Sequence, residues 1–174
     1  TGVQTCALPI LQNAPADTFV DITDIIDYNM SCLNKSNLAE SFFYLSSKDP
    51  EQGFTCDLTT VAGPIDGTLP SPAAKTDQQD IALLRLTLGS HLAMHLRTKI
   101  ENDFGYTSTC GISTSKVLSK LAGSRNKPRN QTTLLAVDEP HVLEFMDPHT
   151  LRKVPGVGFK MAHLIESHIT GEET

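Results

Sequence analysis

Apolar residues recur at helical spacing between Gln79 and Asp103, and this is the most regular pattern in the chain. The spacing predicts a long amphipathic helix, and Gly105 stands where a residue with positive φ would end it. Its apolar stripe consists of Ile81, Leu84, Leu88, Leu92, Leu96 and Ile100. Alternating apolar and polar residues predict a strand over Thr18–Thr23, and a second strand is expected over Thr107–Ser113.

Shorter helices are expected after both strands. The first covers Asp24–Leu33, and the second follows a run of three hydroxyl residues, Ser113, Thr114 and Ser115, any of which can cap it. A third helix is expected over Phe159–His168, directly after a glycine-rich turn.

The segment Ser46–Asp80 is rich in Pro, Gly, Thr and Asp. It is longer than an ordinary connection, so we expect a flexible insertion without chemistry of its own. The remaining elements predict an α/β (α+β) fold, in which an antiparallel sheet is backed by helices and a small helical portion follows after about Pro140.

Composition excludes a few classes of protein. Hydrophobic residues make up 39% of the 174 residues, and no apolar run approaches the length of a membrane span. The four cysteines are scattered without a CxxC pair, so we expect reduced thiols in an intracellular protein and no membrane partner.

Charge is distributed unevenly along the chain. The net charge is −6, and residues 1–104 carry 6 Lys and Arg against 13 Asp and Glu. Residues 105–165 reverse this, with 8 basic against 4 acidic residues. A basic stretch of this kind suits contact with nucleic acid, although it also occurs on proteins that bind none.

Lys127 precedes Pro128 in the loop after the second predicted helix. Proline biases the preceding residue toward an extended backbone, so Lys127 is expected on a stiff segment, where it could meet a triphosphate as a point charge. A solvated surface lysine is the alternative, and the spacing alone favours it.

The run Val154-Pro155-Gly156-Val157-Gly158 resembles the hairpin of a helix-hairpin-helix. Glycines let a phosphate approach the main chain, and the unpaired amides of the following helix suit an anion. Val154, Gly156, Val157, Gly158 and Lys160 are therefore candidate residues for DNA binding. A simple tight turn before a helix is the alternative.

The stretch GISTSKVLSKLAGSRNKPRNQTTLL is similar to the late palm segment of Y-family translesion DNA polymerases, whose pattern is close to GIAxNKxLAKxAS…KPNxxTxL. The resemblance is greatest to the iota branch in a fungal-like form. It runs from about Asp17 to Ile165 and is strongest over Leu83–Leu135. It implies that Lys127 contacts the triphosphate of the incoming nucleotide, and that the glycine hairpin begins the thumb, which grips the duplex. Ser115 and Arg129 depart from the pattern.

The resemblance also implies metal ligands. These polymerases use carboxylates to hold two divalent ions, Mg²⁺ or Mn²⁺, and an adjacent Asp-Glu pair precedes a strand like Phe19–Thr23. Those positions fall on Ala16 and Asp17. Asp17 can ligate a metal and is the candidate catalytic residue, whereas the Ala16 methyl group cannot. Either Ala16 is real and the site is degenerate, or the sequence beside residue 10 is unreliable.

The first ten residues, Thr1–Ile10, match the translation of a common short-read sequencing adapter. We expect them to be an artefact and exclude them from functional argument. The expected organisation is then the C-terminal part of a palm over residues 11–139, with the insertion at residues 46–80, and the start of a thumb with a helix-hairpin-helix over residues 140–174.

The resemblance implies a parent protein that is a DNA-directed DNA polymerase of the nucleus, acting in DNA damage bypass. Its partners would be primer-template DNA and a deoxynucleoside triphosphate, and the fragment alone should be inactive. One alternative is a non-catalytic helix-hairpin-helix repair module with a degenerate palm, which Ala16 would favour. Another is an ordinary globular domain whose hairpin is only a turn.

Overall fold

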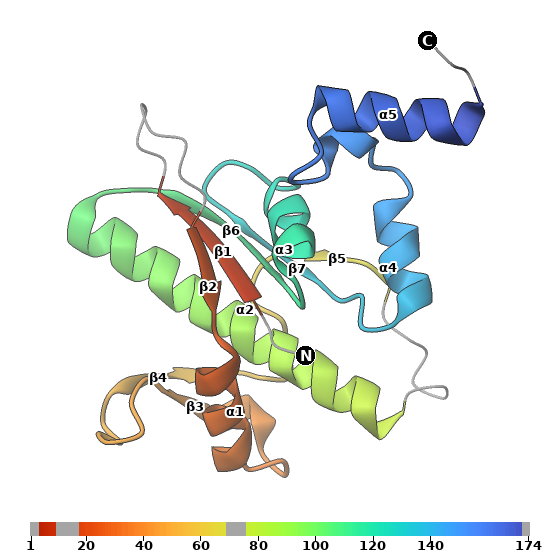
Figure 1. Ribbon diagram of the computed structural model, residues 1–174. Helices are drawn as coiled ribbons and strands as arrows, with labels where there is room; N and C mark the ends of the chain where they lie inside the picture. Colours follow the sequence, from red (N-terminus) through yellow and green to blue (C-terminus); the bar gives the residue numbers. More distant parts are fainter. Residues whose placement is uncertain (1–3, 10–17, 69–75, 172–174) are drawn as a thin grey trace.

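The computed structural model describes residues 4–9, 18–68 and 76–171 (Figure 1), and for residues 4–9 only the backbone is considered. The strands are β1 (Gln4–Pro9), β2 (Thr18–Asp21), β3 (Ser41–Tyr44), β4 (Gly53–Cys56), β5 (Ile65–Asp66), β6 (Ser108–Ser113) and β7 (Gln131–Leu134). The α-helices are α1 (Thr23–Cys32), α2 (Asp77–Phe104), α3 (Lys116–Gly123), α4 (Glu139–Met146) and α5 (Phe159–Thr170); two short 3-10 helices, η1 (Leu38–Glu40) and η2 (Leu151–Lys153), complete the order. Over these residues, none of the helices has both the length and the apolar character of a membrane span.

The predicted α/β architecture is confirmed, with one correction to the sheet. Its strand order is β2-β1-β6-β7-β5, and β3 and β4 form a separate antiparallel pair. Strand β1 runs antiparallel to β2 and β6, but β7 runs parallel to β6 and β5, so the sheet is mixed and not antiparallel throughout. The reason is the α3 crossover between β6 and β7, since a helical crossover brings the second strand back in the same direction.

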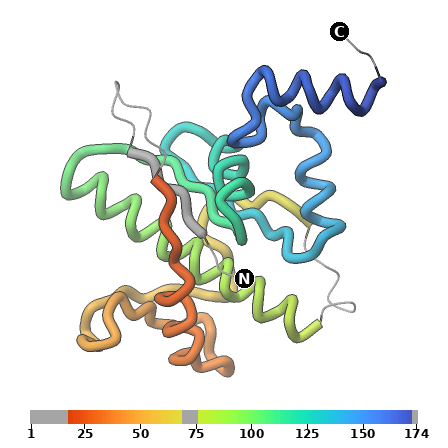
Figure 2. The backbone as a smooth tube through the Cα atoms, in the orientation of Figure 1, coloured from red at the N-terminus to blue at the C-terminus, as the bar shows by residue number. Residues whose placement is uncertain are grey.

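Helices α2 and α3 cover opposite faces of the sheet (Figure 1). Successive residues of β6 point to opposite sides. Cys110 and Ile112 join the core formed with α1 and α2, whereas Gly111 lies against α3. A second cluster on the α3 side comprises Leu118, Leu121, Ala122, Leu134, Ala136 and Phe145. The C-terminal helices α4 and α5 are set to one side of the sheet (Figure 2).

The long helix α2 confirms the prediction from hydrophobic spacing. It begins with a capping box, in which the Thr76 hydroxyl accepts from the Gln79 amide and the Gln79 side chain accepts from the Thr76 amide. It ends at Gly105, which has a φ of 73° and donates its N–H to the Glu101 carbonyl. The positive φ accounts for glycine at this position.

Within Ser46–Asp80, where a flexible insertion was expected, the structure forms strands β4 and β5 and the start of α2. Leu58 is buried in the main core, and the Ala62 amide donates to the Ser90 hydroxyl at 2.9 Å. Residues 69–75 lie outside the described residues. Both strands escaped prediction because they are short. In addition, β5 pairs with β7, which lies far away in the sequence, whereas β4 pairs with the nearby β3.

The backbone of β1 lies in the adapter-like segment that sequence analysis excluded from functional argument. Its residues pair with β2 and β6, with Cys6 opposite both Phe19 and Gly111. The segment lacks hydrophobic periodicity, but ladder hydrogen bonds use the main-chain groups that every non-proline residue carries. A segment can therefore pair with two strands without a regular pattern of apolar and polar side chains.

Gly111 of β6 and Gly123 of α3 form a close main-chain contact between helix and sheet. A Cβ atom on Gly111 would overlap the Ser119 carbonyl oxygen and would lie 2.9 Å from the Gly123 Cα atom. The main chains of helix and strand therefore touch, with no space for a side chain between them.

We predict that Gly111→Ala lowers the free energy of unfolding by about 3 kcal/mol, because α3 must move off the strand to admit a methyl group. Denaturant unfolding of both proteins measures the difference. Gly158→Ala is the matched control, since its Cβ would meet nothing within 4 Å and its φ of −79° suits alanine. Equal stability of the Gly111 variant and the control would contradict the contact.

Candidate functional site

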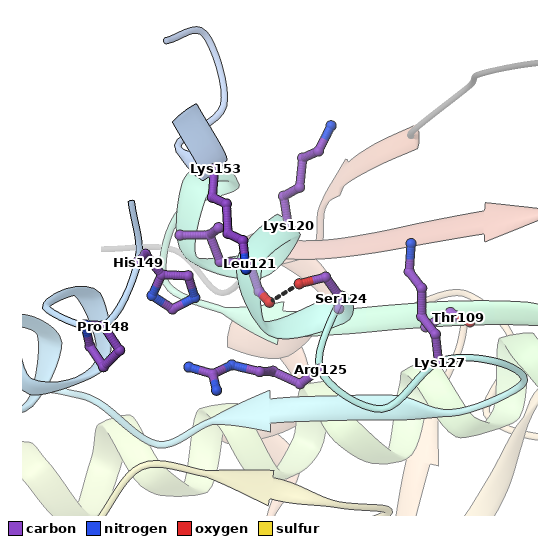
Figure 3. Close-up of a pocket in the computed structure, with 10 residues that line it drawn as sticks. Thr109, Lys120, Leu121, Ser124, Arg125, Lys127, Pro148, His149 and Lys153 are labelled. Atoms are coloured by element: carbon purple, nitrogen blue, oxygen red, sulfur yellow. Dashed lines mark hydrogen bonds between the residues drawn. The ribbon is translucent and has the colours of Figure 1, made fainter. Parts of the chain in front are cut away.

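A hollow of about 530 Å³ lies between the end of α3 and the segment after α4 (Figure 3). Its lining is strongly basic. The lining residues are Thr109, Lys120, Leu121, Gly123, Ser124, Arg125, Lys127, Pro148, His149 and Lys153. The basic stretch counted along residues 105–165 is thus partly gathered at one place, beside the predicted nucleotide loop.

Helix α3 positions one wall of the hollow. Of the three candidate caps, Ser115 caps the helix, because its hydroxyl accepts from the Leu118 amide at 3.2 Å. Leu118 and Leu121 are buried toward the sheet, and Lys120 is exposed in the last turn. The amphipathic pattern of the helix therefore turns Lys120 outward, toward the hollow.

The loop that carries Lys127 is anchored at both ends. The Ser124 hydroxyl donates to the Leu121 carbonyl at 2.7 Å (dashed in Figure 3), and the Asn126 side-chain amide donates to the Thr132 hydroxyl at 2.7 Å. Arg129, which departs from the family pattern, pairs with Glu101 of α2 at 2.6 Å. Lys127 itself is exposed and lines the hollow.

Gln131, the first residue of β7, holds the far end of this loop against α2. Its side chain is fully buried and donates to the carbonyls of Ala62 and Ser90, both at 2.8 Å. It accepts from the Arg97 guanidinium at 3.1 Å. Partial burial lowers the pKa of Arg97 from its ordinary value, and the guanidinium donates to the Gln131 side chain and to the Ser108 carbonyl.

Strand register brings the Lys127 loop to the sheet edge where β2 begins. Gln131 pairs with Cys110, Pro9 at the end of β1 pairs with Ser108, and Thr18 at the start of β2 pairs with Ala7. The starts of β6 and β7 therefore share one edge. Strand β2 reaches the same edge only through its pairing with β1, the adapter-like strand. Ala16 and Asp17 lie outside the described residues, and Thr18 is the next residue after them in the chain.

The described residues do not supply a metal centre, since they contain no group of three or more His, Cys, Asp or Glu side chains able to hold an ion. The Asp21 carboxylate accepts from the Thr23 amide at 2.9 Å and from its hydroxyl at 2.6 Å, and these bonds lower its pKa. Asp21 therefore serves the entry to α1. The resemblance implies metal ligands at the positions of Ala16 and Asp17. Alanine cannot ligate a metal, so this pair does not complete a two-metal site.

The glycine hairpin has the turn-and-helix geometry that the sequence predicts. Gly156 has a φ of 88°, and the Val157 amide donates to the Val154 carbonyl at 3.0 Å. Gly158 is the N-cap of α5, and no side chain caps the helix. The first-turn amides of a helix lack intrahelical partners, so this end can hold an anion. Val157 is half-buried, and Lys160 is exposed.

Of the ten residues that line the hollow, the sequence singled out Lys127; Thr109, Arg125, His149 and Lys153 are among those that it did not. Arg125 and Lys153 were counted in the basic stretch without being singled out. Nothing in the sequence marks Thr109, which sits within a strand. The four come from separate segments, so only the packing of α3 and η2 brings them together.

We predict that Gln131→Leu lowers the free energy of unfolding by about 3 kcal/mol, because three hydrogen bonds are lost and Arg97 is left without one of its buried acceptors. Chemical denaturation measures this. Gln78→Leu, at an exposed position in the first turn of α2, is the control and should change stability little. A Gln131 variant as stable as its parent would show that the network does not hold the loop.

The sequence is similar to a known protein family and to known proteins. Residues 10–124 match the model of the impB/mucB/samB family. The chain is 24% identical to human DNA polymerase iota over 160 residues, covering 91% of this chain and 18% of that protein. It is 29% identical to DNA polymerase iota of Drosophila melanogaster over 150 residues, covering 86% of this chain and 17% of that protein. The chain thus spans less than a fifth of the length of these relatives.

A solved structure described as a post-insertion binary complex of Dbh DNA polymerase is 21% identical and covers 49% of this chain and 26% of that one. The TM-score of 0.37 is low, and the fold described above stands on its own strands and helices. The family match extends over most of the chain, from the segment before β2 through α3. The chain therefore belongs to the impB/mucB/samB family, the Y-family of translesion DNA polymerases.

Proposed function

We propose that this chain is part of a template-directed DNA polymerase that acts in translesion synthesis by nucleotidyl transfer to a primer 3′ end. Family membership supports the class of reaction. The structural observation that carries the proposal is the exposed Lys127, which stands on an anchored loop and lines a basic hollow.

In this proposal Lys127 binds the triphosphate of the incoming deoxynucleoside triphosphate. Its backbone lies after the anchors formed by Ser124 and Asn126 and before the one formed by Arg129, and its side chain is exposed. A lysine on an anchored backbone presents its ammonium group to phosphate as a point charge.

The hairpin residues Val154, Gly156, Val157, Gly158 and Lys160 bind the backbone of primer-template DNA. The open space at both glycines supports this role, because a Cβ built at either would meet no other atom within 4 Å and a phosphate can approach the main chain. Contacts of this kind position a duplex without reading its sequence.

The parent enzyme would use Mg²⁺ or Mn²⁺ held by carboxylates, with Asp17 as one ligand. The donor set of this chain is incomplete at Ala16, so no metal-dependent step is assigned to it. We also propose that Thr1–Ile10 derive from an adapter, that residues 11–139 belong to the palm and residues 140–174 to the thumb, and that the parent acts in the nucleus.

Ala16 favours a second function, in which the chain binds DNA without catalysis. If this residue is genuine, a non-catalytic helix-hairpin-helix module that binds DNA during repair fits the chain better. Sequencing the source gene through the junction at Leu11 separates the two. Asp-Glu in place of Ala16-Asp17 supports the polymerase, whereas Ala16 with no upstream acidic strand supports the binding module.

We predict that Lys127→Ala weakens binding of a deoxynucleoside triphosphate about tenfold, the loss expected for one charge-assisted contact, and leaves duplex affinity nearly unchanged. Titration calorimetry with the nucleotide and fluorescence anisotropy with DNA measure the two affinities. Lys48→Ala, which removes an exposed charge between β3 and β4, is the control. Equal nucleotide affinity in both variants would refute the role of Lys127.

We predict that the purified 174-residue chain does not extend a primer with either Mg²⁺ or Mn²⁺, because its carboxylate set is incomplete. A gel-based primer-extension assay checks this, with an intact family member as the positive control. Template-directed incorporation by the chain would overturn the prediction and would show that the carboxylates present suffice.

A further inference from the structure

Arg129 adopts a backbone conformation that residues other than glycine rarely take. Its φ is 49°, and in the described part of the chain it is the one non-glycine residue with a positive φ. A side chain is crowded against the main chain in this left-handed region, so such a residue stays there only where other contacts hold it. Arg129 is also a residue that departs from the family pattern, because it stands between Pro128 and Asn130. The extra residue in the loop is thus accommodated by an unfavourable backbone conformation.

A bidentate ion pair holds Arg129 in this conformation. Its Nε atom donates to Glu101 Oε2 at 3.1 Å, and its Nη2 atom lies 2.6 Å from Glu101 Oε1. Two nitrogens of one guanidinium therefore meet both oxygens of one carboxylate, which is the strongest and most directional form of this contact. A lysine would not reproduce it, since an ammonium group lacks the planar fork.

The pair reaches the part of the loop that the other anchors leave open. Asn126 is tied to Thr132, and the Asn130 carbonyl accepts from the Cys110 amide at 3.0 Å. Between these points, the pair with Glu101 is the polar contact that joins residues 127–129 to the rest of the described structure. Lys127 lies within this stretch, two residues before the arginine.

The end of α2 offers a rigid point of attachment. Glu101 lies in the last turn of the helix, where its carbonyl accepts from the Gly105 amide at 2.8 Å. Arg97, one turn earlier on the same face, donates to the Ser108 carbonyl at 3.2 Å and to the Gln131 side chain at 3.1 Å. One face of α2 therefore holds the start of β6, the start of β7 and the loop that leads into β7.

We infer that Arg129 is a positioning residue, whose bidentate pair with Glu101 clamps the Lys127 loop to α2 and compensates for the residue inserted in that loop. The consequence for Lys127 rests on the proposed function, whereas the clamp rests on the contacts alone. The two side chains are 63% and 31% exposed, and an ion pair of this exposure contributes little to overall stability. Its effect is therefore local, on the order of the loop and on the position of its lysine.

The test combines hydrogen–deuterium exchange and calorimetry on the 174-residue chain. Arg129→Ala and Glu101→Gln should each speed exchange in residues 126–130 about threefold at nearly unchanged Tm, because an exposed pair shifts local opening and not global unfolding. Both should also weaken binding of a deoxynucleoside triphosphate about threefold, less than Lys127→Ala does. The matched control is Lys99→Ala, which breaks an equally exposed ion pair with Asp103 within α2 and should change neither measurement.

Two further variants separate the pair from its single members. Arg129→Ala combined with Glu101→Gln should exchange no faster than either single variant, because the two residues share one interaction. Arg129→Lys keeps the charge and loses the fork, so it should recover only part of the protection and of the nucleotide affinity.

Exchange in Arg129→Ala equal to that in Lys99→Ala, or single effects that simply add in the double variant, would overturn the inference. It would also fail if Lys127→Ala lost nucleotide affinity and Arg129→Ala kept it, since the clamp would then not position the lysine. If Lys127→Ala keeps its nucleotide affinity, the proposed function fails, and faster exchange with a non-additive double variant still supports the clamp.

Discussion

The contact between Gly111 and Gly123 sets the position of the Lys127 loop and of the basic hollow beside it. It brings the main chain of α3 directly against β6, with no side chain between them. The loop that carries Arg125 and Lys127 leaves the helix immediately after Gly123. Thr109 lies two residues before Gly111, on the same face of the strand. One backbone contact thus fixes both the floor and one wall of the hollow.

The C-terminal segment takes its place from the same side of the sheet. Phe145 of α4 packs in the cluster with Leu121 and Leu134, and it also carries the Arg125 guanidinium on its ring. Because α4 is held in this way, η2 and Lys153 close the hollow before the chain enters the glycine hairpin. Charge and packing therefore cooperate at Arg125, which belongs to both the core edge and the site.

Much of the fold could be predicted where the information is local. The spacing of leucines predicted α2, Gly105 predicted its end, and the glycines near Val157 predicted a turn before a helix. The pairing of β5 with β7 and the parallel direction of β7 depend on distant partners, so the sequence pattern alone did not reveal them. The residues of the site differ in the same way. Lys127 could be found from the proline that follows it, whereas nothing in the sequence near Thr109 marks that residue.

The central claim is that two separate elements bind phosphate in different molecules, with the Lys127 loop serving a nucleotide and the hairpin serving DNA. Hydrogen–deuterium exchange of the chain with each ligand in turn tests this most directly. The account predicts that a deoxynucleoside triphosphate slows exchange in residues 124–130, and that duplex DNA slows exchange in residues 156–161. Protection of neither segment, or protection by both ligands only elsewhere in the chain, would contradict it.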